Sequence, residues 1–146
     1  MKKLTLFLLV KDHIDQKVFL SVLGRQGRRF RVRVYSDPEK LLDVSGQQSP
    51  HILVMGYHDK TEEDIDFIQG LKGRHRKLRA ILVTADGLTG EILDALDRHA
   101  IDGYVNKPLN KASLERQFIN LARDMAKVEV TIPFKKESDQ TSSGEG

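Results

Sequence analysis

The chain has no cysteine among its 146 residues, which excludes disulfide bonds and thiolate-ligated metal sites. It also lacks an apolar run long enough to cross a membrane, because the run from Leu4 to Val10 stops at Lys11. No small-residue cleavage site follows that run, so it does not have the pattern of a signal peptide. These absences lead us to expect a cytoplasmic protein with no membrane segment.

The length and composition suit one domain with a single core. The mass is 16.6 kDa and 39% of the residues are hydrophobic. We expect this domain to occupy residues 1–127. The character of the sequence changes after Lys127, so residues 128–146 are expected to form a C-terminal extension or linker that is partly disordered.

Apolar runs and helical patterns alternate along the chain. Each apolar run favours a strand, and the segment after it carries apolar residues at helical spacing and often a capping residue such as Asp37 or Thr89. The alternating Phe30–Tyr35 segment suits an edge strand. Five strand–helix units in strict alternation predict an α/β fold, a doubly wound parallel sheet with helices on both faces. The expected strands are Leu4–Val10, Phe30–Tyr35, His51–Met55, Ala80–Val83 and Ile101–Val105, and the last helix is expected over Lys111–Lys127.

Doubly wound sheets place their sites at the carboxyl ends of the strands. The residues at those ends are therefore the candidates for function. They are Lys11 and Asp12, Gly56, Thr84 and Ala85, and Asn106 and Lys107.

Over about residues 4–125 the chain resembles the receiver domain of two-component response regulators. The resemblance depends on the five strand–helix units, on Thr84-Ala85, and on the segment Gly103-Tyr104-Val105-Asn106-Lys107-Pro108. It implies a flavodoxin-like (βα)5 fold with a five-stranded parallel sheet in the order 2-1-3-4-5. It also implies a role in phosphorelay signal transduction.

The resemblance makes Gly56 the most informative residue. In the family an acidic pair after the first strand holds Mg²⁺, an aspartate at the end of the third strand accepts the phosphoryl group, and a hydroxyl and a lysine stabilise it. Here Gly56 occupies the acceptor position and Lys11 replaces the first acid. We therefore expect no enzyme activity, no Mg²⁺ or other cofactor, and a non-phosphorylatable protein-interaction module.

The remaining pocket residues by resemblance are Lys11, Asp12, Thr84 and Lys107. Because an unpaired lysine in such a cleft is costly, Lys11, Asp12 and Lys107 are expected to form a small internal ion-pair cluster. One of the two lysines is expected to fill the space that the missing aspartate leaves.

The resemblance also points to a surface for partners. Tyr104 stands at the position of the family's switch aromatic, which responds to movement at Thr84-Ala85; a tyrosine half-packed on the last helix explains it equally well. The expected partner is a protein bound at the fourth helix, fifth strand and fifth helix. The resemblance also allows a homodimer through this face.

Two alternatives stay open at this point. A relocated acceptor, Asp59 or His58, would make the chain an active receiver. The pocket could instead sense a small anion or a nucleotide, although no glycine-rich loop follows the first strand.

Basic residues gather in two runs, Arg25–Arg33 and Lys72–Arg79, and the isoelectric point is about 9.2. Such runs can bind phosphate backbones. However, a solvated edge strand and a helix C-terminus account for them, and no helix-turn-helix, zinc-finger or aromatic-basic pattern accompanies them. Nucleic acid is therefore not an expected partner.

The C-terminal extension has two parts in the sequence. Residues 128–134 alternate weakly between apolar and polar and are expected to add a strand or an ordered segment. Residues 135–146 are polar and rich in serine and glycine, so disorder is expected there.

Overall fold

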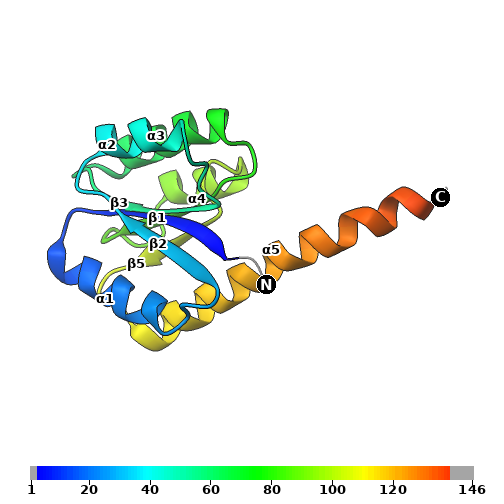
Figure 1. The fold of residues 1–146 in the computed structure, drawn as a ribbon. Helices are drawn as coiled ribbons and strands as arrows, with labels where there is room; N and C mark the ends of the chain where they lie inside the picture. The colour runs from blue at the N-terminus through cyan, green and yellow to red at the C-terminus, as the bar shows by residue number, and fades with distance from the viewer. Residues whose placement is uncertain (1–2, 139–146) are drawn as a thin grey trace. The chain divides into compact units, whose positions relative to one another are not determined.

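The structure, a computed structural model, describes residues 3–138 of the chain. Five parallel strands form one sheet in the order β2-β1-β3-β4-β5, and the predicted fold class and strand order are confirmed (Figure 1). The strands are β1 (Leu4–Val10), β2 (Phe30–Val34), β3 (Ile52–Gly56), β4 (Arg79–Thr84) and β5 (Gly103–Asn106). The helices are α1 (His13–Gly24), α2 (Pro38–Ser45), α3 (Thr61–Arg74), α4 (Gly90–Asp97) and α5 (Lys111–Ser138).

The chain divides into two units, residues 1–114 and residues 115–146. The first contains the whole sheet, helices α1 to α4 and the start of α5. The second contains the rest of α5 within the described residues. The site described below lies entirely in the first unit.

The central strands of the sheet are buried on both faces because nearly all of their residues are apolar. Phe7 and Leu9 of β1 are fully buried in a cluster with apolar residues of α2, α3 and α4. Successive strand residues point to opposite faces, so Leu6 and Leu8, also fully buried, face the side on which α1 lies (Figure 1). This two-sided burial explains why β1 reads as a continuous apolar run.

The caps predicted for two helices are present. The Asp37 side chain accepts a hydrogen bond from the backbone N–H of Lys40 at 2.9 Å, and Pro38 occupies the first turn of α2. The Thr89 hydroxyl accepts one from the N–H of Ile92 at 3.2 Å and starts α4.

The strand order reverses at β1, which pairs with β2 on one side and β3 on the other. The register aligns Val10 with Gly56, so the ends of β1 and β3 lie side by side. This reversal point is where doubly wound sheets bind their ligands.

Three predicted strands differ from the structure by one residue at one or both ends, and two predicted elements differ by more. The fifth strand begins at Gly103 instead of Ile101, because Ala100 and Ile101 are buried in the core cluster as part of the preceding turn. The last helix continues to Ser138, so residues 128–134 form the ordered segment that was one of the two expectations and not a strand, and residues 135–138 are helical as well. A lone strand leaves its backbone groups unpaired, whereas a continuing helix pairs them locally. Residues 139–146 lie outside the described part of the chain.

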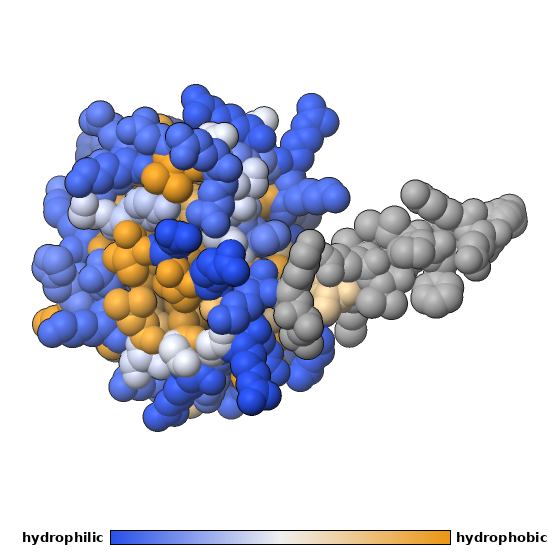
Figure 2. Space-filling model, in the orientation of Figure 1, coloured by the Kyte–Doolittle hydropathy of each residue, from blue (hydrophilic) through white to orange (hydrophobic). Residues whose placement is uncertain are grey.

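The outer surface is mostly hydrophilic, with an apolar area on the face shown in Figure 2. Within the described residues, none of the helices combines the length and apolar character that a membrane crossing requires.

Candidate functional site

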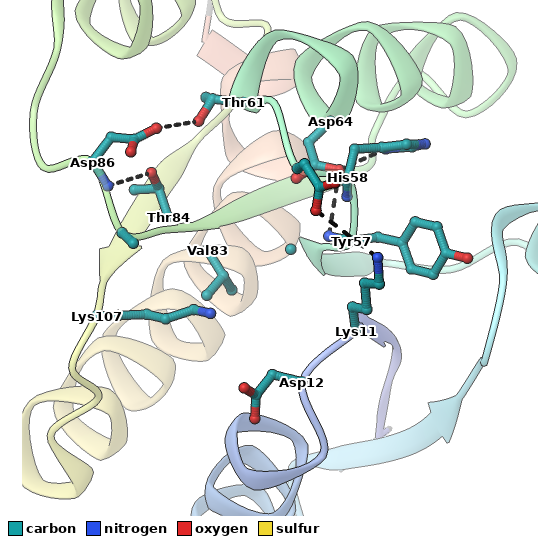
Figure 3. A pocket seen from close by; sticks show the side chains of 13 residues that line it. Lys11, Asp12, Tyr57, His58, Thr61, Asp64, Val83, Thr84, Asp86 and Lys107 are labelled. Atoms are coloured by element: carbon teal, nitrogen blue, oxygen red, sulfur yellow. Dashed lines mark hydrogen bonds and ion pairs between the residues drawn. The ribbon is translucent and has the colours of Figure 1, made fainter.

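An open pocket of about 420 Å³ lies at the carboxyl ends of the strands (Figure 3). The five predicted pocket residues all line it. Its full lining is Lys11, Asp12, Gly56, Tyr57, His58, Asp59, Thr61, Asp64, Val83, Thr84, Ala85, Asp86 and Lys107.

Gly56 ends β3 where the neighbouring strand comes close. A Cβ atom placed on Gly56 would lie 2.8 Å from Val83 Cβ and 3.1 Å from the Val83 carbonyl oxygen. Both atoms are held rigidly by β4, and Val83 itself is buried. The backbone has therefore closed over the place where a side chain at position 56 would begin.

Lys11 does not fill that place. Its side chain is 64% exposed, its Nζ lies 3.9 Å from Asp59 Oδ1, and the same Nζ lies 6.0 Å from the centre of the Tyr57 ring. Figure 3 shows the side chain turned toward the loop after β3. Asp59 is almost fully exposed, so this is a loose surface ion pair.

Asp12 is the N-cap of α1. Its Oδ1 accepts hydrogen bonds from the backbone N–H groups of Ile14, at 2.8 Å, and Asp15, at 3.1 Å. The hydrogen bonds from Asp15 and Ile14 hold the pKa of this carboxyl below its usual range, since they favour the charged form. The Asp12 carboxylate is therefore already engaged by the N-terminus of α1.

Lys107 pairs with Asp15, a residue that the sequence did not single out. Its Nζ lies 2.8 Å from Asp15 Oδ2, and the Asp15 side chain is 15% exposed. The predicted cluster of Lys11, Asp12 and Lys107 is therefore wrong in its members. Each lysine has an acidic partner, but the two pairs are separate and Asp12 belongs to neither.

Thr84 holds the loop after β4. Its side chain is buried, and its Oγ1 accepts a hydrogen bond from the Asp86 N–H at 3.0 Å. Asp86 in turn accepts a hydrogen bond from the Thr61 hydroxyl at 2.9 Å. These contacts tie the β4–α4 loop to the start of α3 across the pocket.

The most buried charge of the pocket is Asp64, in the first turn of α3. Its side chain is 3% exposed, and its Oδ1 lies 2.8 Å from His58 Nδ1. The same oxygen accepts hydrogen bonds from the N–H groups of His58, at 2.9 Å, and Tyr57, at 3.4 Å. Burial raises the pKa of Asp64, and the hydrogen bonds from His58 and Tyr57 oppose that rise.

The sequence suggested only a helix start at Asp64. The spacing between His58 and Asp64 carries no known motif, so the carboxylate's role depends on how the β3–α3 loop folds back over the helix. Figure 3 shows the His58 ring directed away from Thr84 and Lys107.

The pocket's charge balance is acidic. Two lysines, Lys11 and Lys107, face four aspartates. In the described part of the chain, no group of three or more histidine, cysteine or acidic side chains is arranged to hold a metal ion. The four aspartates are Asp12, Asp59, Asp64 and Asp86.

The two residues expected to respond to the pocket lie at different depths. Ala85 is exposed at the rim. Tyr104 is half-buried against the core cluster of α2, α3 and α4.

No protein-family model matches the chain, and no curated protein matches it in sequence. Solved structures do match it. A CheY-like response regulator receiver domain from Methanospirillum hungatei JF-1 aligns with a TM-score of 0.71 at 14% identity and covers 86% of this chain and 98% of that one.

Two further structures agree. A two-component response regulator from Clostridium difficile aligns with a TM-score of 0.70 at 16% identity, over 84% of this chain and 98% of that one. The Vibrio cholerae chemotaxis protein CheY4 aligns with a TM-score of 0.68 at 11% identity, over 82% and 98%. The chain is thus similar in fold, over most of its length, to response-regulator receiver domains.

Proposed function

We propose that the chain is a receiver-fold module of two-component signalling that acts by binding protein and accepts no phosphoryl group at position 56. The observation that carries this proposal is the contact between Gly56 and Val83. Glycine offers no nucleophile, and the 2.8 Å approach to Val83 Cβ leaves no room for one. The missing side chain and the closed space support the same conclusion.

The donor set also argues against Mg²⁺ binding. A hard divalent cation needs several oxygen ligands, but position 56 offers no side-chain oxygen and Lys11 adds a positive charge. Asp12 Oδ1 is engaged by the N-terminus of α1, and Asp64 is engaged by His58. The residues present therefore do not fit the ion that receiver domains use, and we expect no cofactor.

Incubation with acetyl phosphate and Mg²⁺, followed by intact-protein mass spectrometry, tests the proposal. We expect no phosphorylated species. A receiver domain with its acceptor aspartate serves as the positive control under the same conditions. Stoichiometric phosphorylation of this chain would overturn the proposal.

The site of any label would decide between the two relocated acceptors. His58 has the better geometry, because Asp64 fixes its ring through Nδ1 and leaves Nε2 as the free nitrogen. However, the ring points away from Thr84 and Lys107, so no pocket group would stabilise a phosphoryl group there (Figure 3). An acid-labile label that is absent in His58→Gln, or a hydroxylamine-sensitive label that is absent in Asp59→Asn, would establish the corresponding alternative.

The pocket does not favour an anion sensor. Both lysines are ion-paired, and the acidic residues outnumber them. We expect no thermal stabilisation by phosphate or nucleotides. Saturable stabilisation that disappears in Lys107→Met would support a sensor instead.

Two exposed leucines support a protein contact on the α4 side. Leu88, in the loop before α4, is 56% exposed, and Leu93 of α4 is 49% exposed. Apolar side chains of this size suit the centre of a protein interface. If these leucines form the contact of a homodimer, Leu88→Gln together with Leu93→Gln will lower the mass found by sedimentation. Ile14→Gln is the matched control, since Ile14 is 73% exposed on α1.

A further inference from the structure

The two basic runs, Arg25–Arg33 and Lys72–Arg79, meet at the side of the sheet where its parallel strands begin, opposite the pocket. We call this side the amino-terminal edge, and the side where the strands end the carboxyl edge. Backbone hydrogen bonds connect the strand starts in order, since the N–H of Leu4 donates to the Arg29 carbonyl and the N–H of Arg79 donates to the His51 carbonyl. The N–H of His51 bonds to the Thr5 carbonyl and completes the line. With strands about 4.8 Å apart, Arg29 and Arg79 lie about 14 Å from each other along this edge.

This edge carries a strong excess of unpaired positive charge. Of its acids, Asp102 pairs with Lys72 at 2.7 Å and Asp94 pairs with Arg98 at 2.9 Å. Among the described residues of the first unit, 3–114, the other acids at this edge are Asp43 and Asp97, near the ends of α2 and α4. Within residues 3–138, no hydrogen bond or ion pair engages the side chains of Lys3, Arg25, Arg28, Arg29, Arg74, Arg76, Lys77 and Arg79.

The turns that carry these side chains are fixed by the core. Phe30 is 3% exposed and Leu78 is 2% exposed, so each turn is anchored by a buried apolar residue. Backbone hydrogen bonds from Arg29 N to the Gln26 carbonyl, at 2.8 Å, and from Leu78 N to the His75 carbonyl, at 3.0 Å, close the two turns. The backbone that carries the cationic groups is therefore fixed, so binding does not have to order the two turns.

The character of the edge selects the kind of partner. Its large apolar residues are buried, so it offers no apolar anchor for a protein interface and none for insertion into a membrane. Within the described residues it has no exposed aromatic ring on which single-stranded bases could stack. Six of its eight unpaired cations are arginines, whose guanidinium groups bind phosphate in a bidentate manner.

From these observations we infer that the amino-terminal edge binds the phosphate backbone of duplex nucleic acid without sequence preference. The sequence led to the opposite expectation because each basic run had a local explanation by itself. The structure joins the runs into one surface. This activity does not depend on how the pocket works.

Fluorescence anisotropy with a labelled DNA duplex of about 20 base pairs tests the inference. We expect two unrelated sequences to bind equally well, and the affinity to fall steeply between about 50 and 200 mM salt. The variant Arg28→Gln/Arg29→Gln/Arg76→Gln/Lys77→Gln should weaken binding at low salt by at least about tenfold. The slope of log K against log salt should decrease by about one for each phosphate that the variant no longer neutralises.

The matched control removes four charges elsewhere. Lys17, Lys40, Lys60 and Lys111 are exposed and lie away from this edge. Their change to glutamine should leave most of the affinity, because the phosphates would not contact them. Unfolding midpoints of both variants, compared with the parent chain, show whether the fold is intact.

Three results would overturn the inference. Absence of binding at low salt would be one, and equal weakening by the two four-charge variants would be another, since net charge alone would then explain the attraction. The third is binding to phosphatidylserine vesicles that is stronger than binding to DNA and is abolished in the variant that changes Arg28, Arg29, Arg76 and Lys77. That result would assign the edge to membranes instead.

Discussion

The two edges of the sheet carry charge in opposite ways. At the carboxyl edge, Lys107 has an acidic partner at 2.8 Å and Asp64 accepts hydrogen bonds within its own loop. At the amino edge, Arg28, Arg29 and Arg76 have no such partner in the described part of the chain. Charged groups that hold their own loops are not available to a ligand, whereas unpaired ones are. The comparison thus favours the amino edge as the place where charge is used for binding.

The carboxyl edge is also tightly packed at one position. At the carboxyl edge, β3 and β4 come so close at Gly56 that a side chain there would meet Val83. Receiver-type chemistry needs a carboxylate at that place. The pocket is open, but it has no room for such a side chain at position 56.

The largest effect is expected from Gly56→Asp, which directly tests the close approach of β4 to Gly56. The new Cβ would lie 2.8 Å from Val83 Cβ, so the strands must separate and the free energy of unfolding should fall by ~1–3 kcal/mol. Urea unfolding measures the change. Gly70→Ala is the control, because nothing lies within 4 Å of that Cβ and an alanine inside α3 should stabilise the protein by up to ~1 kcal/mol.

Adding Lys11→Asp to Gly56→Asp tests whether the metal site can be rebuilt. A second carboxylate removes the repulsion from Lys11, so the double variant should bind Mg²⁺ more tightly than Gly56→Asp alone. The crowding at Val83 should keep both affinities low. Normal stability of Gly56→Asp together with strong Mg²⁺ binding would show that position 56 has room for a carboxylate after all.

The next largest effect is expected from changes to Asp64, the buried carboxylate of the pocket. Asp64→Ala leaves the N–H groups of His58 and Tyr57 without their acceptor, so we expect stability to fall by ~1–3 kcal/mol. Asp64→Asn retains an acceptor oxygen and removes a buried charge, so its stability at pH 7 should lie close to that of the parent chain. Equal destabilisation in the two variants would mean that the charge, and not the hydrogen-bond acceptor, is what the loop needs.

The same carboxylate predicts a pH dependence. Its pKa is raised above the ordinary value of 3.8, so the folded state binds this proton more tightly than the unfolded state. Its contribution to stability is complete below pH 3.8 and is lost as the pH rises through the raised pKa. Relative to the parent chain, Asp64→Asn should therefore gain stability as the pH rises from about 3.8 and then level off. Chemical unfolding across this range measures the difference, and a flat difference would contradict the shift.

The sequence was sufficient for the frame of the molecule and insufficient for its contacts. The apolar run Leu4–Val10 and the caps Asp37 and Thr89 are local signals, and the structure agrees with them. Which acid pairs with Lys107 depends on side-chain directions across three elements, so Asp15 was missed. The buried pairing of Asp64 with His58 depends in the same way on the path of a loop.

The smallest effects distinguish the two ion pairs of the carboxyl edge. Lys107→Met removes a half-buried partner of Asp15 and should cost ~1 kcal/mol or less, whereas Lys11→Met breaks a 3.9 Å surface pair and should change stability by less than ~0.5 kcal/mol. Chemical unfolding at low and high salt measures both changes. Salt should reduce the effect at Lys107 only partly, because Asp15 is shielded from solvent. If Lys11→Met lowered stability as much as Lys107→Met, Lys11 would also be part of the pocket's internal structure. Both lysines of the carboxyl edge would then be held by their ion pairs, in contrast to the unpaired cations of the amino edge.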